Sequence, residues 1–321
     1  MDFTGRKILV TGGAGFLGSN LCHALAGLGA RVTALDGFLF GGGANPANLD
    51  GADVELVRAD IREIDLRNLC EGVDVIYNLA AQTSHMGGQR DPLADIDINA
   101  VAQVRLIQAA REAAPNAIVV HASTRQFYGR PHYLPVDEEH PVNPPDANGV
   151  SKFAGEQYWM IEHRTAGRPV VSLRLTNCYG PRLRIRDARQ TFLGIWMRLA
   201  LEGKPFEVWG GDQLRDMTYV DDVTAAFLAA AAPSCHGRVF NIGGPPPASL
   251  LEIAGMLARI VPGTRFITRE FPADRATIDI GSYHANDGAF REATGWAPLV
   301  GLEEGIARSL EWYKTRLALY L

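Results

Sequence analysis

The fold of this chain is decided by the stretch Lys7-Ile8-Leu9-Val10-Thr11-Gly12-Gly13-Ala14-Gly15-Phe16-Leu17-Gly18. Its apolar run from Ile8 to Val10 predicts a buried parallel strand, and the residues from Ser19 to Leu28 predict a helix. Between them, Gly12 allows a tight turn, Gly15 lets the backbone approach a pyrophosphate, and Gly18 lets the helix pack against the strand. With a strand before it and a helix after it, the turn is typical of a dinucleotide-binding site, which Gly12, Gly15, Phe16 and Leu17 would form at the positive end of the helix.

An acidic residue follows where a ribose would be held. The second predicted strand, Arg31 to Leu35, ends at Asp36, roughly 20 residues after the glycines. A carboxylate at this position accepts hydrogen bonds from the ribose hydroxyls of NAD and repels the 2′-phosphate of NADP. The sequence therefore predicts NAD as the cofactor.

Composition narrows the function classes. The chain has 321 residues, of which 47% are hydrophobic and 21% charged, and its net charge of −5 does not favour nucleic acid. Its four cysteines are far apart and form no CxxC pair, so neither a metal site nor a disulfide framework is expected. The first strand leaves no room for a signal peptide, and no apolar run reaches membrane-spanning length. We expect a cytoplasmic enzyme with no membrane or nucleic-acid partner.

Strands and helices alternate through the first half of the chain. Further strands are predicted at 54–58, 73–79, 117–121, 169–175, 205–209 and 239–242, and helices at 97–114, from a cap at Asp146 or Asn148 to Arg164, at 192–201, 221–231, from a Ser249–Glu252 capping box to Ile260, and at 301–316. This order predicts an α/β fold with a doubly wound parallel sheet. We assign residues 1–180, with 220–248 returning, to an NAD-binding domain, and 181–219 with 249–321 to a smaller, interleaved substrate lobe.

Two loops are candidates for further cofactor contacts. Asp60 and Ile61 follow a strand and could hold an adenine by its amine and its face, or Asp60 could be an exposed turn residue. The segment Leu79-Ala80-Ala81-Gln82 has small residues that would let its backbone pass close to a cofactor. Asn99 is expected to tie its helix to a neighbouring loop.

Together these residues resemble the extended short-chain dehydrogenase/reductase family, specifically its nucleotide-sugar epimerases and dehydratases. The resemblance covers nearly the whole chain and rests on the glycine stretch and on Asp60-Ile61, Asn78 to Gln82, Ser123-Thr124, Tyr128-Gly129, Ser151-Lys152, Arg174 to Pro181, Arg215-Asp216 and Tyr219 to Asp222. It implies a Rossmann-type sheet that binds NAD and a smaller C-terminal lobe that binds an NDP-sugar. It also implies a homodimer formed through the helices after the fourth and fifth strands.

The catalytic pair departs from the family pattern. The family has Tyr-x-x-x-Lys; Lys152 matches the lysine, but Asn148 occupies the tyrosine position. Asparagine does not titrate, so it can hydrogen-bond a sugar hydroxyl but cannot be the base. Thr124 matches the Ser/Thr that normally shares the hydroxyl proton. Arg125-Gln126 stand where 4,6-dehydratases carry an Asp-Glu pair, which argues against a standard 4,6-dehydratase.

Three groups are candidates for the missing base. Lys152, with its pKa lowered by burial and by the nicotinamide charge, could carry or relay the proton, or could only hold the ribose. Tyr128 could reach in from the next loop or be structural. His85, after the fourth strand, could serve as a base because histidine is the side chain suited to proton transfer near neutral pH, or it could be a solvated loop residue. Cys178 is expected near the nicotinamide and the sugar, where it could simply pack.

On the substrate side, the resemblance assigns two contacts. Arg215 matches the arginine that pairs with the NDP-sugar diphosphate, and Asn177 matches a substrate-contacting asparagine. The basic stretch with Arg182, Arg184, Arg186 and Arg189 adds positive charge, and we expect one or two of these, Arg189 among them, to face the substrate.

The sequence thus predicts an NAD-dependent NDP-sugar epimerase that removes a hydride from a sugar carbon, most simply C4, and returns it. The alternatives are oxidation at C4 coupled to C3 or C5 epimerisation, decarboxylation or atypical dehydration, and, in another class, a redox-inactive protein that binds NAD or an NDP-sugar.

Overall fold

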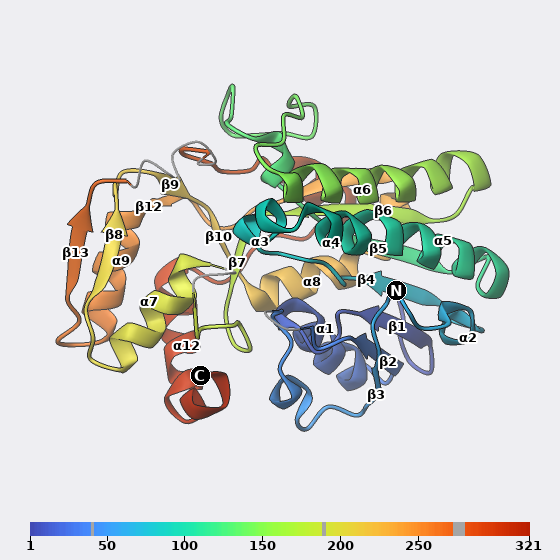
Figure 1. The fold of residues 1–321 in the computed structure, drawn as a ribbon, viewed down its shortest axis with the longest axis horizontal. Helices are drawn as coiled ribbons and strands as arrows, with labels where there is room; N and C mark the ends of the chain where they lie inside the picture. The colour runs from blue at the N-terminus through green and yellow to red at the C-terminus, as the bar shows by residue number, and fades with distance from the viewer. Residues whose placement is uncertain (40–41, 188–190, 272–279) are drawn as a thin grey trace.

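A seven-stranded parallel sheet runs through the computed structural model, which describes residues 1–39, 42–187, 191–271 and 280–321 (Figure 1). The strand order is β3-β2-β1-β4-β5-β6-β11. The strands are β1 (Lys7–Thr11), β2 (Arg31–Asp36), β3 (Val54–Arg58), β4 (Val75–Asn78), β5 (Ile118–Thr124), β6 (Val170–Leu175) and β11 (Arg238–Ile242). The order reverses between β1 and β4, which is where doubly wound sheets bind ligands at their carboxyl edge. The predicted fold class is confirmed.

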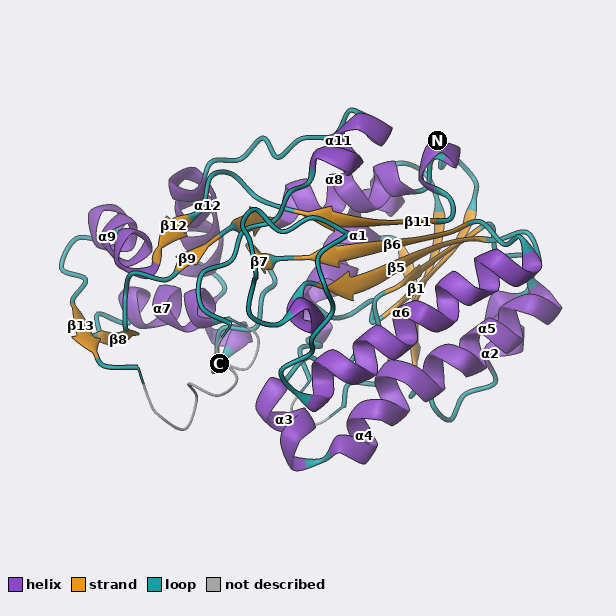
Figure 2. Cartoon of the chain, turned by 90° about the horizontal axis from the view of Figure 1, so that it is seen from above, coloured by secondary structure: helices purple, strands orange, loops and turns teal. Residues whose placement is uncertain are grey.

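Helices cover both faces of the sheet because its strands are apolar on both sides. Ile8 and Val10 pack into the core on one face with α1 (Phe16–Gly27) and α8 (Val220–Ala230), whereas Leu9 packs with the helices on the other face. Figure 2 shows these two layers. The second layer contains α2 (Leu66–Cys70), α5 (Ala102–Ala113) and α6 (Ala147–Ala166).

A second hydrophobic core lies to one side of the sheet, at the left of Figure 1. It is built mainly by α7 (Phe192–Leu201), α9 (Leu250–Ile260) and α12 (Leu302–Lys314), together with β8 (Phe206–Trp209), which pairs with β13 (Phe266–Arg269). Short strands connect the two parts: β7 (Asn177–Tyr179) with β10 (Met217–Tyr219), and β9 (Leu214–Arg215) with β12 (Ala248–Ser249). The remaining elements are α3 (His85–Arg90), α4 (Pro92–Ile96), α11 (Gly288–Thr294), the π-helical η2 (Asp97–Val101), and the short η1 (Pro46–Leu49), η3 (Gln126–Tyr128), η4 (Pro233–Cys235) and η5 (Leu317–Tyr320).

Several element predictions are confirmed and others need correction. Helix 192–201 and the Ser249–Glu252 capping box are as predicted, and Asp146, not Asn148, caps α6. The first helix begins at Phe16 rather than Ser19, because the Ser19 N–H already bonds the Gly15 carbonyl. The predicted helix 97–114 is π-helical in its first turn, and α3, α4, α11 and β13 were not predicted.

Candidate active site

The glycine turn has the shape that a pyrophosphate requires. Gly12 has a φ of +69°, and a Cβ on Gly18 would lie 2.1 Å from the Gly12 carbonyl oxygen. The residue before helix α1 is Gly15, which has no side chain to cap the helix, and the first turn of α1 holds no acidic residue. The first N–H groups of α1 therefore remain available to an anion, so this turn fits the diphosphate of a dinucleotide.

Asp36, at the end of β2, is fixed against this turn. One carboxylate oxygen accepts from the backbone N–H of Ala14 at 3.1 Å, and the other accepts from Phe38 at 3.0 Å. Burial raises the pKa of Asp36, while these backbone donors act against the rise. Each oxygen keeps acceptor capacity, which suits two ribose hydroxyls.

Asp60 is paired rather than exposed. Its side chain is 11% exposed and forms a salt bridge with Arg62 at 2.6 Å, and the hydrogen bond from Arg62 lowers the pKa of Asp60. Ile61 beside it is buried. Their contact with an adenine remains a prediction.

The segment from Leu79 to Gln82 is held beside the glycine turn by Thr11. Thr11 Oγ1 accepts from the N–H groups of Leu79 and Ala80, both at 3.1 Å, and donates to Asn78 Oδ1 at 2.8 Å. A Cβ on Gly12 would lie 2.9 Å from this segment, so the two loops approach as closely as glycine permits. Ala81 follows directly in the same segment.

Asn148 lies in a buried polar network. Its Nδ2 donates to the Gln82 carbonyl and to Asp95 Oδ1, both at 2.9 Å, and only 1% of the residue is exposed. Since both partners can only accept, they determine how the amide is oriented. Asp95 also accepts from Asn99 at 3.2 Å and from Ser151. Both side-chain N–H groups of Asn148, which occupies the family's tyrosine position, therefore already donate hydrogen bonds within the protein.

Asn99 forms the tie that was expected of it. Its Oδ1 accepts from the Gln82 N–H at 2.9 Å, and its Nδ2 donates to the Gln82 carbonyl at 3.3 Å.

Lys152 lies one turn further along α6. Burial lowers its pKa to about 8, although the carboxylates of Asp95 and Asp146 act in the opposite direction. Thr124 ends β5, against which α6 packs, and its Oγ1 accepts from the Gln126 N–H at 3.1 Å.

Tyr128 and Cys178 are poor candidates for the base. The Tyr128 hydroxyl is buried, donates to Asn241 at 2.9 Å and accepts from Arg174 at 2.6 Å. Burial raises its pKa to about 12, against the effect of Arg174. Burial also raises the pKa of the Cys178 thiol to about 12. Tyr128 thus has a structural place in a small buried cluster with Phe127, Val136 and Tyr283, and Cys178 remains a thiol near neutral pH.

His85 is the first residue of α3 and contacts the cap of α6. Its Nδ1 lies 2.9 Å from Asp146 Oδ2, and its side chain is 41% exposed while that of Asp146 is fully buried. Asp146 also accepts from the Gly149 N–H at 2.7 Å and from Gln126 Nε2 at 3.1 Å. Burial favours a higher pKa for Asp146, but hydrogen bonds from His85, Gly149 and Gln126 bring it below its ordinary value. Sequence analysis identified Asp146 only as a cap and missed this pair.

The expected substrate contacts lie on short strands at the border of the second core. Arg215, on β9, is buried and donates to the backbone carbonyls of Leu214 and Gly281. Asn177 Oδ1, on β7, accepts from Arg125 Nη2 at 3.2 Å. These hydrogen bonds are all within the protein, so the contacts of Arg215 and Asn177 with a substrate remain predictions.

Asp216, beside Arg215, was named in the sequence analysis only as part of a family motif and was given no role. Burial raises its pKa to about 6, although Arg125 and the Ala285 N–H oppose the rise.

The basic stretch is largely engaged in the fold. Arg182 donates to Asn48 and Asn20, and Arg184 pairs with Asp187, whereas Arg186 is exposed. Arg189 lies outside the described residues.

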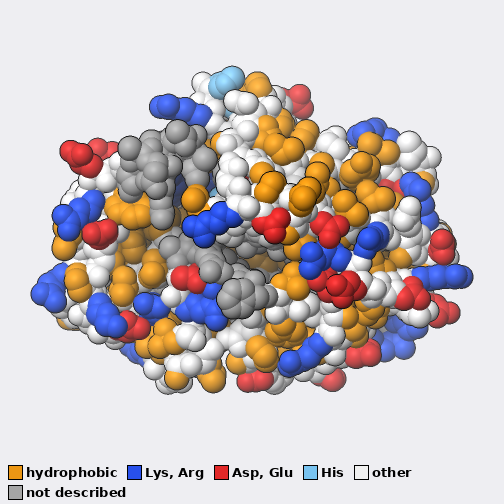
Figure 3. All heavy atoms as spheres, in the orientation of Figure 1, with side chains coloured by type: hydrophobic (Ala, Val, Ile, Leu, Met, Phe, Trp, Pro, Cys, Tyr) orange, Lys and Arg blue, Asp and Glu red, His pale blue; other side chains and the backbone are white. Residues whose placement is uncertain are grey.

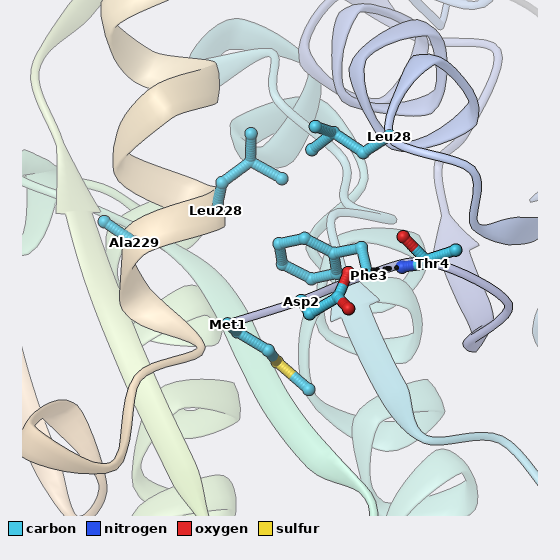
Figure 4. Close-up of a pocket in the computed structure, with 7 residues that line it drawn as sticks. All are labelled: Met1, Asp2, Phe3, Thr4, Leu28, Leu228 and Ala229. Carbon is cyan, nitrogen blue, oxygen red and sulfur yellow. Dashed lines mark hydrogen bonds between the residues drawn. The ribbon is translucent and has the colours of Figure 1, made fainter.

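Figure 4 shows a hollow at the other edge of the sheet. It is lined by Met1, Asp2, Phe3, Thr4, Leu28, Leu228 and Ala229. Because α1 and α8 end there, this hollow lies at the amino ends of the strands and is not part of the site.

Within the described residues we find no group of three or more His, Cys, Asp or Glu suited to a metal ion, and no helix long and apolar enough to cross a membrane. All four cysteines are free thiols.

Comparison with known proteins gives consistent matches. Residues 8–243 match the family described as the NAD dependent epimerase/dehydratase family. A UDP-glucose 4-epimerase of Mycolicibacterium smegmatis is 33% identical over 97% of this chain and 99% of its own length. A UDP-glucuronic acid decarboxylase of Arabidopsis thaliana is 30% identical over 98% of this chain and 72% of its own.

Solved structures agree with the sequence matches. The UDP-glucose 4-epimerase of Thermotoga maritima, solved with UDP-glucose, has a TM-score of 0.88 at 26% identity and covers 97% of this chain and 100% of its own. The UDP-glucuronic acid 4-epimerase of Bacillus cereus, solved with UDP-glucuronic acid and NAD, has a TM-score of 0.85 at 29% identity, covering 97% and 99%.

Proposed function

Because the chain belongs to the NAD dependent epimerase/dehydratase family and is an NAD-dependent nucleotide-sugar epimerase, we propose that it inverts C4 of a UDP-sugar. One observation carries the proposal: the residues that match the family's cofactor and sugar contacts gather at the carboxyl edge of a single sheet. Asp36 and Thr124 end β2 and β5, and Gln82 follows β4. Asn148, in the first turn of α6, donates to the Gln82 carbonyl. The names of the relatives support a UDP-sugar and C4 as the reacting carbon.

The residues of this chain would divide the work as follows. The N–H groups of α1 and the carboxylate of Asp36 would hold the diphosphate and a ribose of NAD, and Lys152 would hold the ribose next to the nicotinamide. When bound, NAD takes a hydride from the sugar carbon and gives it back. Thr124 would hold the reacting hydroxyl. Since both N–H groups of Asn148 are used internally, only its Oδ1 can meet a sugar hydroxyl.

In the second lobe, Arg215 would pair with the diphosphate of the sugar nucleotide. A guanidinium forms two parallel hydrogen bonds to phosphate oxygens, which would anchor the nucleotide while the sugar turns. This rotation of the sugar would let the hydride return to the opposite face of C4.

The test begins with the purified protein and any nucleotide that accompanies it. UDP-glucose, UDP-N-acetylglucosamine and UDP-glucuronic acid are each added in single turnover, and the absorbance of the bound nicotinamide reports its reduction. NMR of the product then distinguishes a C4 epimer from a C3 or C5 epimer, a pentose or a dehydrated sugar. If no sugar nucleotide reduces the cofactor, the protein binds its ligands without redox chemistry and the proposal fails.

We also propose that two copies of the chain pair through the helices after β4 and β5. Six hydrophobic side chains on α4, η2 and α6 are exposed: Leu93, Ile96, Val101, Val150, Tyr158 and Ile161. Figure 3 shows hydrophobic side chains gathered over this side of the molecule. Covering them in a dimer would remove this apolar surface from water.

A further inference from the structure

A histidine–carboxylate pair stands next to the position where the family carries its tyrosine. His85 Nδ1 lies 2.9 Å from Asp146 Oδ2, and Asp146 is two residues before Asn148. The carboxylate is fully buried and held by Gly149 and Gln126, whereas the imidazole is 41% exposed. The ring therefore has a fixed anchor on one side and an open side on the other.

The packing of α3 brings His85 against α6. Gly88, one turn after His85, lies against α6 and Asp95: a Cβ on it would be in contact with Asn148 Cβ at 3.4 Å and only 2.7 Å from Asp95 Oδ1. Residues three apart share a face of a helix, so His85 points to the same side of α3 as Gly88. The titratable ring of His85 therefore extends from α3 toward the start of α6, where Asn148 occupies the family's tyrosine position.

The pair also determines which ring nitrogen is free. An ionised carboxylate only accepts hydrogen bonds, so the neutral imidazole must donate from Nδ1 to Asp146. Nε2 then carries the lone pair. This is the state that a general base requires, and a carboxylate behind the ring stabilises the cation formed when the base takes a proton.

We propose that His85 Nε2 is the general base that receives the proton of the reacting sugar hydroxyl, with Asp146 as its positioning residue. This inference rests on the proposed function. In the step, the O–H bond breaks and an Nε2–H bond forms. The freed electron pair on oxygen becomes the second bond of the carbonyl, and the electron pair of the C–H bond leaves with its hydrogen to the bound NAD. The reverse transfer returns the proton from Nε2 to oxygen.

The other candidates fit this role less well. The Tyr128 hydroxyl is buried and bonded to Asn241 and Arg174. The pKa of Lys152, although lowered to about 8, leaves most of the amine protonated at neutral pH. Lys152 therefore retains the charge that suits a ribose contact.

The first arm of the test needs neither cofactor nor substrate. Long-range ¹H–¹⁵N correlation on protein with ¹⁵N-labelled histidine, assigned by comparison with His85→Ala, reports which nitrogen carries the proton when the ring is neutral. We expect a proton on Nδ1 and none on Nε2. Asp146→Asn, which keeps an oxygen to cap α6 but removes the charge, should weaken this preference. A proton on Nε2 in the wild type would overturn the inference.

The second arm measures hydride transfer in single turnover. His85→Ala should lose about 10²–10⁴-fold in rate, keep its affinity for the sugar nucleotide, and regain part of the rate in added imidazole. His236→Ala, at the opposite edge of the sheet before β11, is the matched control and should keep the wild-type rate.

Two results of this arm refute the role of His85. One is an unchanged rate in His85→Ala. The other is a loss that imidazole does not restore and that comes with lower affinity for the sugar nucleotide, which would make His85 a binding residue. If the wild type itself transfers no hydride with any sugar nucleotide, the proposed function fails. In that case a proton on Nδ1 would mean that His85 and Asp146 form a structural pair with no catalytic use, which also overturns the inference.

Discussion

Replacing Lys152 with Met should make the cofactor-free protein more stable near neutral pH. Burial lowers the pKa of this amine from 10.5 to about 8. At about 1.4 kcal/mol per pKa unit, the charged form costs at most about 3 kcal/mol in the folded state. The side chain is only partly buried, so solvent screening reduces this figure, and we expect a gain of about 1–2 kcal/mol. Met keeps most of the packing volume and removes the charge.

The sign of the pH dependence follows from proton binding. Below pH 8 the lysine is protonated in both the folded and the unfolded state, and its full cost is present. Between about 8 and 10.5 the unfolded state binds more protons than the folded state, so the stability of the wild type rises with pH in this window. Lys152→Met lacks this rise, and the difference between the two proteins should shrink as the pH rises.

Urea unfolding across this pH range measures the difference directly. Lys204→Met is the control, because the Lys204 side chain is 63% exposed, and surface changes are usually within about 0.5 kcal/mol. The reasoning is refuted if Lys152→Met is less stable than the wild type at pH 7, or if the gap between them stays constant up to pH 10.

Three further predictions concern ligand binding and assembly. Asp36→Ala should narrow the preference for NAD over NADP, measured by calorimetry, because the residue no longer repels a 2′-phosphate; equal affinities in the wild type would contradict this. Arg215→Ala should weaken UDP-sugar binding by about 2–5 kcal/mol and leave NAD binding nearly intact; an unchanged UDP-sugar affinity would show that the substrate lobe is misassigned. Ile161→Lys should shift the protein from dimer to monomer in sedimentation analysis, whereas Lys314→Met, on α12, should not; a wild-type monomer would remove the dimer proposal.

The fold could be predicted well where the pattern is local. The strand Ile8–Val10, the glycine turn and the 192–201 helix each have a periodicity or a turn that depends on neighbouring residues only. The prediction fails where tertiary contacts decide the backbone. The first turn of the helix at 97–114 is π-helical, in a segment where the Asn99 side chain is held by Gln82 and Asp95. Asp95 is one helical turn before Asn99, but Gln82 is 17 residues away, and spacing along the chain does not identify it as the partner.

The site shows the same division between local and distant contacts. Lys152, Thr124 and Arg215 could be assigned because they match short motifs, although their contacts with ligands remain predictions. The pairing of His85 with Asp146 spans 61 positions and depends on how α3 packs against α6, so the sequence only left His85 as one of three candidates.

The buried hydrogen bonds of Asn148 give this residue a structural role that a tyrosine at the same position would not have. Its amide joins the Gln82 carbonyl to Asp95 in a buried site. Removing it would cost these two hydrogen bonds, at about 0.5–1.5 kcal/mol each, because Asn99 would still donate to both acceptors. A tyrosine in its place would forfeit these bonds and would also have to fit a ring where Gly88 already packs against the Cβ. We therefore expect that restoring the family residue would disturb the packing of α3 on α6. The same packing of α3 on α6 places His85 against Asp146, two residues from Asn148, so a titratable ring lies close to the position where the family carries its tyrosine.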